Sequence, residues 1–555
     1  MPFRRHRSLD SDEDSDPDIS DPGEGEQAKF PVSDSTKLTR LLILGGTHVI
    51  HLQPRSSGPP QADSGWSVVD KMIQDGRGEE VVEVLKDMSV RGRTSRQEGL
   101  IFALAMCIRS QDSKTKRAGY DAISGICSIP TTLFLLVSYV EAIGKMRQPP
   151  STGWGRGLRR AVSIWYNRHD HDPVPLAMHV TKYASRHKWS HRDLFRLSHI
   201  KPVNAAVGFI VRYVLKGLDE AERFYLEDGY LDRENLEKVH RYLKGVEEAK
   251  MCEDEKMTIK LIQEHRLVRE HLRTEMLNSA EVWRVMLPDM PLTAMLRNLA
   301  KMTTLGLLND VTSLNMVKTK LLNVEAMKMA RVHPLKILIA HRTYARGKGE
   351  KGKLVWNPHP VILDTLDKAF YQSFSMVQPT GKKFLIGLDI SSSMGSAIPN
   401  SSISCREAAA CMCMVTMKTE ECCEVVGFHD KLIPLPEFMD KDKTLDDLVV
   451  YTQNLGFGAT DCSKPMTHAR KKGKDVDVFV ILTDCETNFH MVSPWRALQR
   501  YRDKMNKPTA KLVVVAMTAD SFSIARPDDV HMLDVAGFDP DLPEVIRDFL
   551  IGDFE

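Results

Sequence analysis

The sequence lacks any run of about 18 apolar residues, the length that a membrane-spanning helix requires. It also lacks an apolar stretch at its N-terminus, which reads MPFRRHRSLDSDEDSDPD. A secretory signal peptide needs such a stretch, so none is expected. These two absences predict a protein without membrane contact that stays inside the cell. The predicted compartment is the cytoplasm, with the nucleus as an additional one.

Cysteine is scarce, with 10 in 555 residues, and no two cysteines have CxxC spacing. Inside a cell these thiols are expected to be reduced. Cys411 and Cys413 lie in a helical Ala/Met run, and Cys422 and Cys423 begin an apolar strand. Structural zinc sites need cysteines that converge from loops. The pattern therefore favours buried core thiols over a zinc site.

Charge of one sign is missing from one part of the chain and scarce in another, although the net charge is only +2. Residues 9–27 hold nine acidic and no basic residues among Ser, Pro and Gly, so we predict a disordered acidic tail over 1–27. Residues 145–201 hold twelve Lys and Arg against three acidic residues, with six histidines. A solvated face normally mixes both signs. This excess, with Trp154, Trp165, Tyr166, Tyr183 and Trp189 interleaved, predicts a nucleic-acid interface.

Two structural classes follow one another along the chain, which is too long for one hydrophobic core. From Trp66 to Phe374, segments such as EEVVEVLKDMSVRGR and TTLFLLVSYVEAIG place apolar residues at i, i+3 and i+4. Short polar breaks separate them, which predicts stacked helix pairs of HEAT-like type over residues 28–373. Residues 374–555 instead alternate buried strands such as KKFLIGLDI with helices. This alternation predicts an α/β domain with a doubly wound, mostly parallel sheet.

Three polar loops follow apolar segments of the second domain. They contain Asp389-Ile390-Ser391-Ser392-Ser393, Thr460 and Asp484. Together they resemble the metal-ion-dependent adhesion site of von Willebrand factor A domains. The resemblance implies that Ser391, Ser393 and Thr460 bind a divalent ion, while Asp389 and Asp484 hold its waters or bind it directly. Such hard oxygen ligands suit Mg²⁺ or Mn²⁺. The alternative is that these groups only cap the following helices.

The polar loops favour binding over catalysis. A metal-dependent nuclease would need several carboxylates around one or two ions. Here the expected ligands are mainly hydroxyls, and Glu486 is the one obvious base nearby. We therefore expect no enzymatic activity. An open coordination position would accept a carboxylate or phosphate from a partner, including a protein ligand.

The chain resembles the Ro autoantigen family, the ribonucleoproteins with a TROVE domain. The match rests on GWGRGLRRAVSIWYN, TKYASRHKWSHRDLFRLSHIKP, MPLTAMLRNLAKMT and PTGKKFLIGLDISSSM, in this order. The resemblance implies a ring of HEAT-like helix pairs closed by the A domain. It also implies a monomer within a small ribonucleoprotein, which binds Y RNA on the outer surface. Single-stranded 3′ ends of misfolded small noncoding RNAs would enter the central hole, in RNA quality control.

The family's Y RNA contacts correspond to Lys182, Arg186 and His199. Lys182 and Arg186 are four residues apart, so we predict that they share one helix face and meet adjacent phosphates. His199 can donate to a phosphate or stack on a base. Further candidates in the basic segment are Arg156, Arg159, Arg160, Arg192 and Arg196. Arg266, Arg269 and Arg273 either line the hole or pair with Glu264 and Glu270.

Two other functions remain as alternatives. The first is a metal-dependent protein-interaction scaffold that does not bind RNA, and the second is a metal-dependent nuclease. The basic segment favours RNA binding over the scaffold. The hydroxyl-rich metal loops disfavour the nuclease.

Overall fold

The structure is a computed structural model of the chain. The residues that it describes are 30–44, 50–51, 66–92, 97–146, 150–151, 154–226, 233–349, 352–399, 401–440, 442–455, 458, 460–484, 492–518, 524–526, 528–538, 540 and 542–552. The predicted acidic tail lies outside these residues, and so does Glu486.

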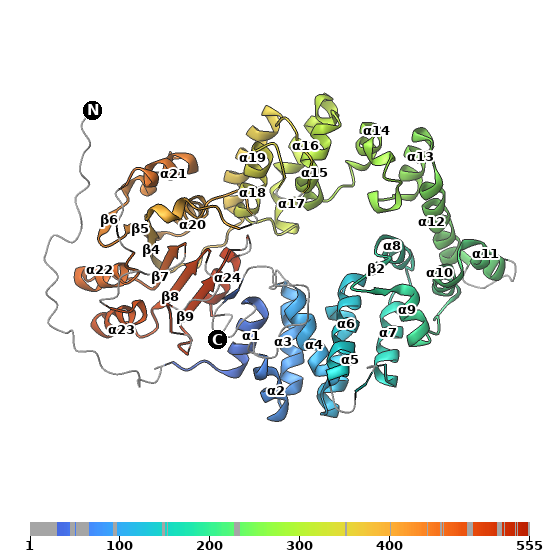
Figure 1. The fold of residues 1–555 in the computed structure, drawn as a ribbon, viewed down its shortest axis with the longest axis horizontal. Coiled ribbons are helices and arrows are strands. Elements are labelled where there is room, and N and C mark those ends of the chain that lie inside the picture. The colour runs from blue at the N-terminus through green and yellow to red at the C-terminus, as the bar shows by residue number, and fades with distance from the viewer. Residues whose placement is uncertain are drawn as a thin grey trace. The chain divides into compact units, whose positions relative to one another are not determined.

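The chain forms two compact units (Figure 1). The helical unit comprises residues 57–291 and 302–316, and the sheet unit comprises residues 1–56, 292–301 and 317–555. The α-helices of the helical unit are α2 (Ser67–Gln74), α3 (Gly78–Arg91), α4 (Gln97–Arg109), α5 (Ser113–Ile126), α6 (Pro130–Met146), α7 (Arg156–Asn167), α8 (Val174–Lys182), α9 (His191–Ser198), α10 (Ala205–Lys216), α11 (Leu218–Leu226), α12 (Arg233–Met251), α13 (Glu255–His265) and α14 (Ala280–Met286).

The helical unit also contains short elements. These are the 3-10 helices η1 (Arg269–His271), η2 (Met276–Asn278) and η3 (Leu307–Asn309), and the strands β2 (Ser185–Arg186) and β3 (Trp189–Ser190). Helices α15 (Leu292–Thr304) and α16 (Val311–Leu321) each contain residues of both units.

Helices of the helical unit stack on one another, as the sequence predicts. Helix α4 packs on α6, α5 on α7, and α7 on α9. Local signals fix the helix ends. Asp112 caps α5 by accepting a hydrogen bond from the Thr115 amide at 2.7 Å, and Gly92 ends α3 in the left-handed conformation. The apolar stripes between these ends pack against one another and form the core of the unit.

The sheet unit contains a seven-stranded sheet in the order β1-β9-β8-β7-β4-β5-β6. Its pairings are parallel except for β6, which runs antiparallel to β5. This confirms the mostly parallel sheet. The strands are β1 (Ile50–His51), β4 (Lys383–Asp389), β5 (Cys422–Phe428), β6 (Leu432–Pro434), β7 (Val478–Thr483), β8 (Lys511–Ala516) and β9 (Met532–Ala536).

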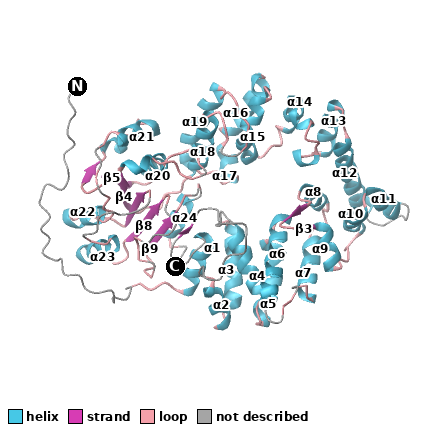
Figure 2. Ribbon diagram, in the orientation of Figure 1, coloured by secondary structure: helices cyan, strands magenta, loops and turns pink. Residues whose placement is uncertain are grey.

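Helices cover both faces of this sheet (Figures 1 and 2). On one face, Leu385, Phe479 and Leu512 form a core with residues of α22 and α23. The opposite face packs on α20, which contacts β4, β5 and β7. The helices of this unit are α1 (Asp34–Leu44), α17 (Val324–Met329), α18 (Pro334–Ala345), α19 (Pro360–Gln372), η4 (Ser373–Met376), η5 (Ser392–Gly395), α20 (Cys405–Thr419), η6 (Pro436–Met439), α21 (Leu445–Gln453), α22 (Lys464–Lys472), α23 (Pro494–Met505) and α24 (Leu542–Leu550).

A segment from near the N-terminus completes the sheet. Strand β1 pairs in parallel with the edge strand β9. The Arg40 guanidinium on α1 donates to the Val530 carbonyl at 2.9 Å, and the Phe30 carbonyl accepts from the Val530 amide at 2.9 Å. The predicted domain boundary between residues 373 and 374 does not anticipate this contribution, because an edge strand of two residues carries no readable periodicity.

Two negative findings apply to the described residues. None of their helices combines the length and apolar character needed to cross a membrane. They also contain no cluster of three or more His, Cys, Asp or Glu side chains placed to hold a metal ion. Cys411 and Cys413 are buried on α20, as predicted for core thiols, whereas Cys422 is exposed. Burial raises the pKa of the Cys413 thiol, so this thiol is neutral.

Candidate nucleic-acid interface and metal site

Helix α7 presents a basic face to solvent because its apolar residues occupy the opposite side. Leu158, Val162 and Trp165 are fully buried. This spacing turns Arg156, Arg159 and Arg160 away from the core. Arg156 and Arg160 are exposed, and Arg159 is half-buried.

The prediction that Lys182 and Arg186 share a helix face is wrong. Helix α8 ends at Lys182, and Arg186 lies in β2, which pairs with β3 in a two-stranded hairpin. The turn residues His187 and Lys188 have φ of 52° and 66°, the positive values that a tight hairpin turn requires. Tertiary packing overrides helical spacing here, since Trp189 of β3 contacts Trp154 with ring centroids 5.9 Å apart. Both cations still face solvent, with Arg186 exposed and Lys182 half-buried.

Helix α9 contributes the remaining cations. Ser190 caps it, and Asp193 completes a capping box, so this acidic side chain is engaged by the backbone. Arg192 and Arg196 are exposed one turn apart. His199 ends the helix in the left-handed conformation with φ of 51°, which leaves its ring exposed.

We call these eight side chains the basic face. Its members are Arg156, Arg159, Arg160, Lys182, Arg186, Arg192, Arg196 and His199. None of them forms an ion pair with a residue that the structure describes. Arg192 donates weakly to the Val214 carbonyl, at 3.4 Å, and Lys182 lies 5.3 Å from the centre of the Tyr183 ring. Their charge is therefore available to an anionic partner.

Several aromatic residues that the sequence pattern assigned to the interface belong to the core. Trp165 and Tyr166 are fully buried, and Trp154 is only 9% exposed. The Tyr166 hydroxyl hydrogen-bonds the Nδ1 atom of His191 at 2.7 Å, behind the basic face. These rings support α7 and α9 and cannot stack on bases. The alternation of aromatic and basic residues in the sequence does not show which side of a helix each residue occupies. That depends on how the helix is rotated against the core.

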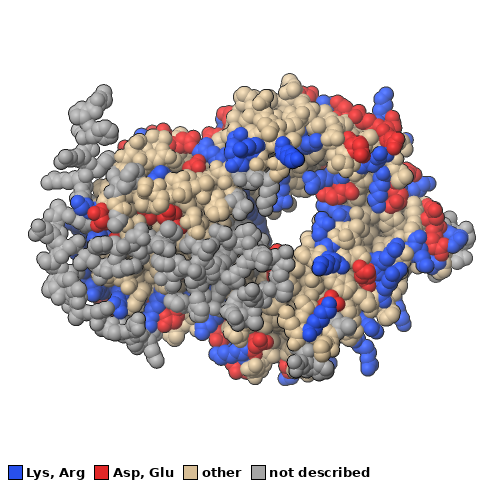
Figure 3. All heavy atoms as spheres, viewed as in Figure 1, with Lys and Arg blue, Asp and Glu red and all other residues tan. Residues whose placement is uncertain are grey.

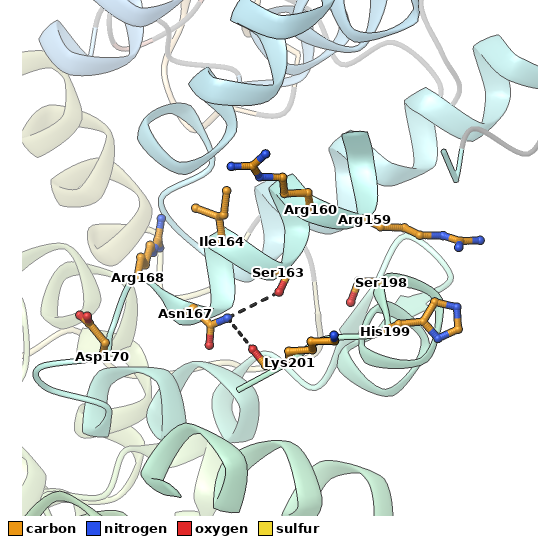
Figure 4. A pocket seen from close by; sticks show the side chains of 10 residues that line it. All are labelled: Arg159, Arg160, Ser163, Ile164, Asn167, Arg168, Asp170, Ser198, His199 and Lys201. Atoms are coloured by element: carbon orange, nitrogen blue, oxygen red, sulfur yellow. Dashed lines mark hydrogen bonds between the residues drawn. The ribbon is translucent and has the colours of Figure 1, made fainter. Parts of the chain in front are cut away.

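A pocket of 420 Å³ lies between α7 and the loop that joins α9 to α10 (Figure 4). Asn167 holds this loop in place, since its amide donates to the Lys201 carbonyl at 3.0 Å and its oxygen accepts from the Val203 amide at 3.1 Å. Sequence reasoning missed Ser198, because a buried serine carries no charge signal, and it counted Lys201 in the basic segment without assigning it a role. The lining residues are Arg159, Arg160, Ser163, Ile164, Asn167, Arg168, Asp170, Ser198, His199 and Lys201.

Several cations elsewhere in the helical unit are paired with acids. Arg269 pairs with Glu270 at 3.0 Å, one of the two alternatives left open by the sequence. Arg273 instead pairs with Glu253 at 2.6 Å and with Glu275 at 3.4 Å. Figure 3 shows Lys and Arg interspersed with Asp and Glu over α11 to α13.

The predicted metal loops meet at one edge of the sheet. Strands β4 and β7 are parallel neighbours, so Asp389 and Asp484 emerge side by side at their carboxyl ends. The Thr483 hydroxyl donates to Asp389 Oδ2 at 2.7 Å. The Asp461 amide donates to the His429 carbonyl at 3.2 Å, which brings the Thr460 loop to the end of the adjacent strand β5.

The electrostatics of this edge suit a cation. Asp389 is 1% exposed, and its pKa is raised by burial, while the charge of Asp484 acts in the same direction. Its Oδ1 accepts from the Ser391 amide at 2.8 Å, and the hydroxyl oxygens of Ser391 and Ser393 lie 2.9 Å apart. A divalent ion would offset the repulsion between the two carboxylates. Hydroxyl and carboxylate oxygens are also the ligand types that Mg²⁺ accepts, so the residues present fit the group.

Fold and sites together define a class: a helical-repeat protein with an unpaired basic face, joined to a von Willebrand A-type domain. Comparison with known proteins identifies the family. The TROVE domain profile matches residues 22–382, and the Ro60 vWA domain profile matches residues 383–550. The chain belongs to the TROVE-domain family of Ro proteins.

Two relatives and one solved structure cover most of the chain. The chain is 36% identical to RNA-binding protein RO60 of Caenorhabditis elegans, covering 94% of this chain and 89% of that protein. It is 32% identical to RNA-binding protein RO60 of Deinococcus radiodurans, covering 94% of both. The crystal structure of the Deinococcus radiodurans RO (RSR) protein matches with a TM-score of 0.82 and 31% identity, over 94% of this chain and 100% of that one.

Proposed function

We propose that this protein binds RNA through the basic face of α7 to α9. The unpaired cations of that face carry the proposal, because phosphate neutralisation dominates nucleic-acid affinity. The relatives named RNA-binding protein RO60 support it. The scaffold alternative offers no reason for a face on which cations lack acidic partners.

The structured partner that we propose is a Y RNA, held by Lys182, Arg186 and His199 in a small ribonucleoprotein of one protein copy. Single-stranded 3′ ends of misfolded small noncoding RNAs would bind elsewhere, in the central hole that the family resemblance implies. This second mode would serve RNA quality control. The proposed compartment is the cytoplasm, with the nucleus in addition.

Filter binding with three RNAs tests both modes: a Y-like hairpin, a duplex with a single-stranded 3′ tail, and a blunt duplex. Lys182→Ala with Arg186→Ala should weaken hairpin binding roughly 100-fold, the loss expected for two charge-assisted contacts. The slope of log affinity against log salt should flatten by nearly two units, about 0.9 per lost contact.

The tailed duplex should bind the double variant nearly as well as the wild type, because other groups hold the tail. The blunt duplex should bind weakly throughout, since an A-form helix exposes few base edges. Equal weakening of all three RNAs would show a single undifferentiated basic surface. Equal wild-type binding of tailed and blunt duplexes would reject the second mode.

The A domain is proposed to bind one divalent ion, Mg²⁺ or Mn²⁺, through Ser391, Ser393 and Thr460 with Asp389 and Asp484. The ion would leave a position open for a carboxylate or phosphate of a partner, including a protein. Calorimetric titration with Mn²⁺ tests this. Ser393→Ala should weaken binding about tenfold or more, since a directly bound oxygen is lost. Exposed Ser392 provides the matched control, and Ser392→Ala should bind as the wild type does.

We also propose that this ion does not cut RNA. Purified protein with Mg²⁺ should leave structured and single-stranded RNA intact on a denaturing gel. Cleavage that is present in the wild type and absent in Asp484→Ala would reject this proposal and favour the nuclease.

A further inference from the structure

The pocket between α7 and the α9–α10 loop contains two hydrogen-bond donors that lack a partner. Ser198 is only 5% exposed, and its hydroxyl is buried without a hydrogen bond to any described residue. The Nε atom of Arg159 is likewise buried and unpaired. Unpaired buried polar groups are rare in folded proteins because they lose water without compensation. Two of them in one pocket are available to an acceptor that enters it.

The charges around these donors identify that acceptor as an anion. Arg159, Arg160, His199 and Lys201 line the pocket with one acidic residue, Asp170. In Figure 4, Ser198 lies between Arg159 and His199. Arg168 is already committed, since its guanidinium donates to the Ser124 carbonyl at 2.8 Å and the Ser128 carbonyl at 2.6 Å. The uncommitted donors thus come from α7 and from the end of α9, and Figure 4 shows Arg159 extending to the same side as His199 while Arg160 points away from it.

We infer that this pocket binds a phosphate monoester, presented by the end of an RNA strand. The inference rests on the proposed function and adds a specific subsite to it. A backbone phosphodiester that crosses the exposed arginines of α7 would not reach a hydroxyl as buried as that of Ser198. A strand end can enter. A monoester also carries about −1.5 to −2 charges at neutral pH and three strong acceptor oxygens, which satisfy more of these donors.

The size and rim of the pocket agree with a terminal nucleotide. Its volume of 420 Å³ falls in the range of roughly 300–1,000 Å³ that small-molecule sites occupy. Ile164 on the rim is 49% exposed, although it is a large apolar residue. It offers an apolar surface to the sugar or base that follows the phosphate.

The test compares one hairpin RNA in three forms, with a 5′-phosphate, with a 3′-phosphate and with hydroxyls at both ends, alongside uridine 5′-monophosphate as a free competitor. The wild type should prefer one phosphorylated form by roughly tenfold, the effect of one hydrogen bond to a charged group. Ser198→Ala should abolish this preference without weakening the hydroxyl form. Ser185→Ala, at an exposed serine of the same face, is the matched control and should retain it.

Three further readouts separate a binding role from a structural one. Ser198→Ala removes a buried unpaired hydroxyl, so its unfolding midpoint should stay the same or rise. Lys182→Ala should weaken all three RNA forms equally and keep the preference. Displacement of the phosphorylated RNA by uridine 5′-monophosphate supports the monoester chemistry.

Failure of this inference is distinguishable from failure of the proposed function. Equal binding of all three RNA forms, without binding of uridine 5′-monophosphate, overturns the pocket assignment and leaves RNA binding intact. Equal binding of the RNA forms with tight nucleotide binding overturns the strand end as the source of the phosphate. Absence of binding to any RNA overturns the proposed function itself.

Discussion

Two neighbouring stretches of the helical unit are rich in cations and differ in what those cations contact. On α7 to α9, Arg156, Arg160 and Arg196 are exposed and have no acidic partner among the described residues. From α10 to η2, many basic side chains pair with acids nearby, as in Arg212 with Glu220 at 2.7 Å and Lys238 with Glu234 at 2.7 Å. The two stretches therefore differ in pairing more than in charge content. We expect pairing to reduce anion binding, because a paired cation must give up its carboxylate before it meets a phosphate.

The largest expected effect is the difference in RNA affinity between two double variants, each of which removes two cations from one stretch. Arg192→Ala with Arg196→Ala removes two unpaired charges one turn apart, and hairpin RNA affinity should fall by roughly 10- to 100-fold. Arg223→Ala with Lys238→Ala removes two exposed charges paired with Glu220 and Glu234, and affinity should change less than about twofold. Filter binding at low salt measures both. Equal losses would mean that total charge governs binding.

Acid should reveal two histidines behind the basic face, of which His191 is buried and His179 is half-buried. Burial lowers the pKa of His191 to about 3 and that of His179 to about 4, below the ordinary value near 6.5. The unfolded chain therefore takes up protons first as the pH falls below about 6.5. The stability that these neutral histidines provide is present above that pH and decreases as the pH falls toward 4. At pH 5.5 the loss is about 1 kcal/mol for His191.

Urea unfolding at pH 7.5 and pH 5.5 measures this loss. His191→Gln keeps a polar partner for the Tyr166 hydroxyl but cannot be protonated, so the loss should shrink by about 1 kcal/mol. His199→Gln, at the exposed histidine of the basic face, is the control and should show the wild-type loss. An identical pH response of wild type and His191→Gln would mean that His191 does not stay neutral in the folded protein.

The smallest effect should come from removing an acidic partner, so that cations of the paired stretch become unpaired like those of the basic face. Glu220 accepts hydrogen bonds from both Arg212 and Arg223. Glu220→Gln should release both guanidinium groups and raise RNA affinity about two- to threefold at low salt. Glu248→Gln removes the same charge from an exposed residue that pairs with no cation among the described residues, so it should raise affinity less. If both variants behave alike, net charge alone explains the gain.

The sequence by itself determined the fold class of both units and predicted the residue types of both candidate sites. Amphipathic periodicity predicts the stacked helices, and continuous apolar runs such as Phe384–Leu388 predict the parallel strands. The meeting of the metal loops at one sheet edge is also predictable from the sequence, because residues that follow buried parallel strands share one edge. The excess of cations between residues 145 and 201 likewise locates the basic face.

Only the tertiary structure decided which side chains are exposed to a partner and where Arg186 lies. Four-residue spacing suggests one helix face for Lys182 and Arg186, but the Trp154–Trp189 contact accompanies a hairpin in place of another helical turn. Trp165 and Tyr166 look like stacking residues until the phase of α7 buries them. Strand β1 and the unpaired hydroxyl of Ser198 leave no trace in composition or period. In each case the outcome depends on contacts between residues distant in sequence, which local patterns do not encode.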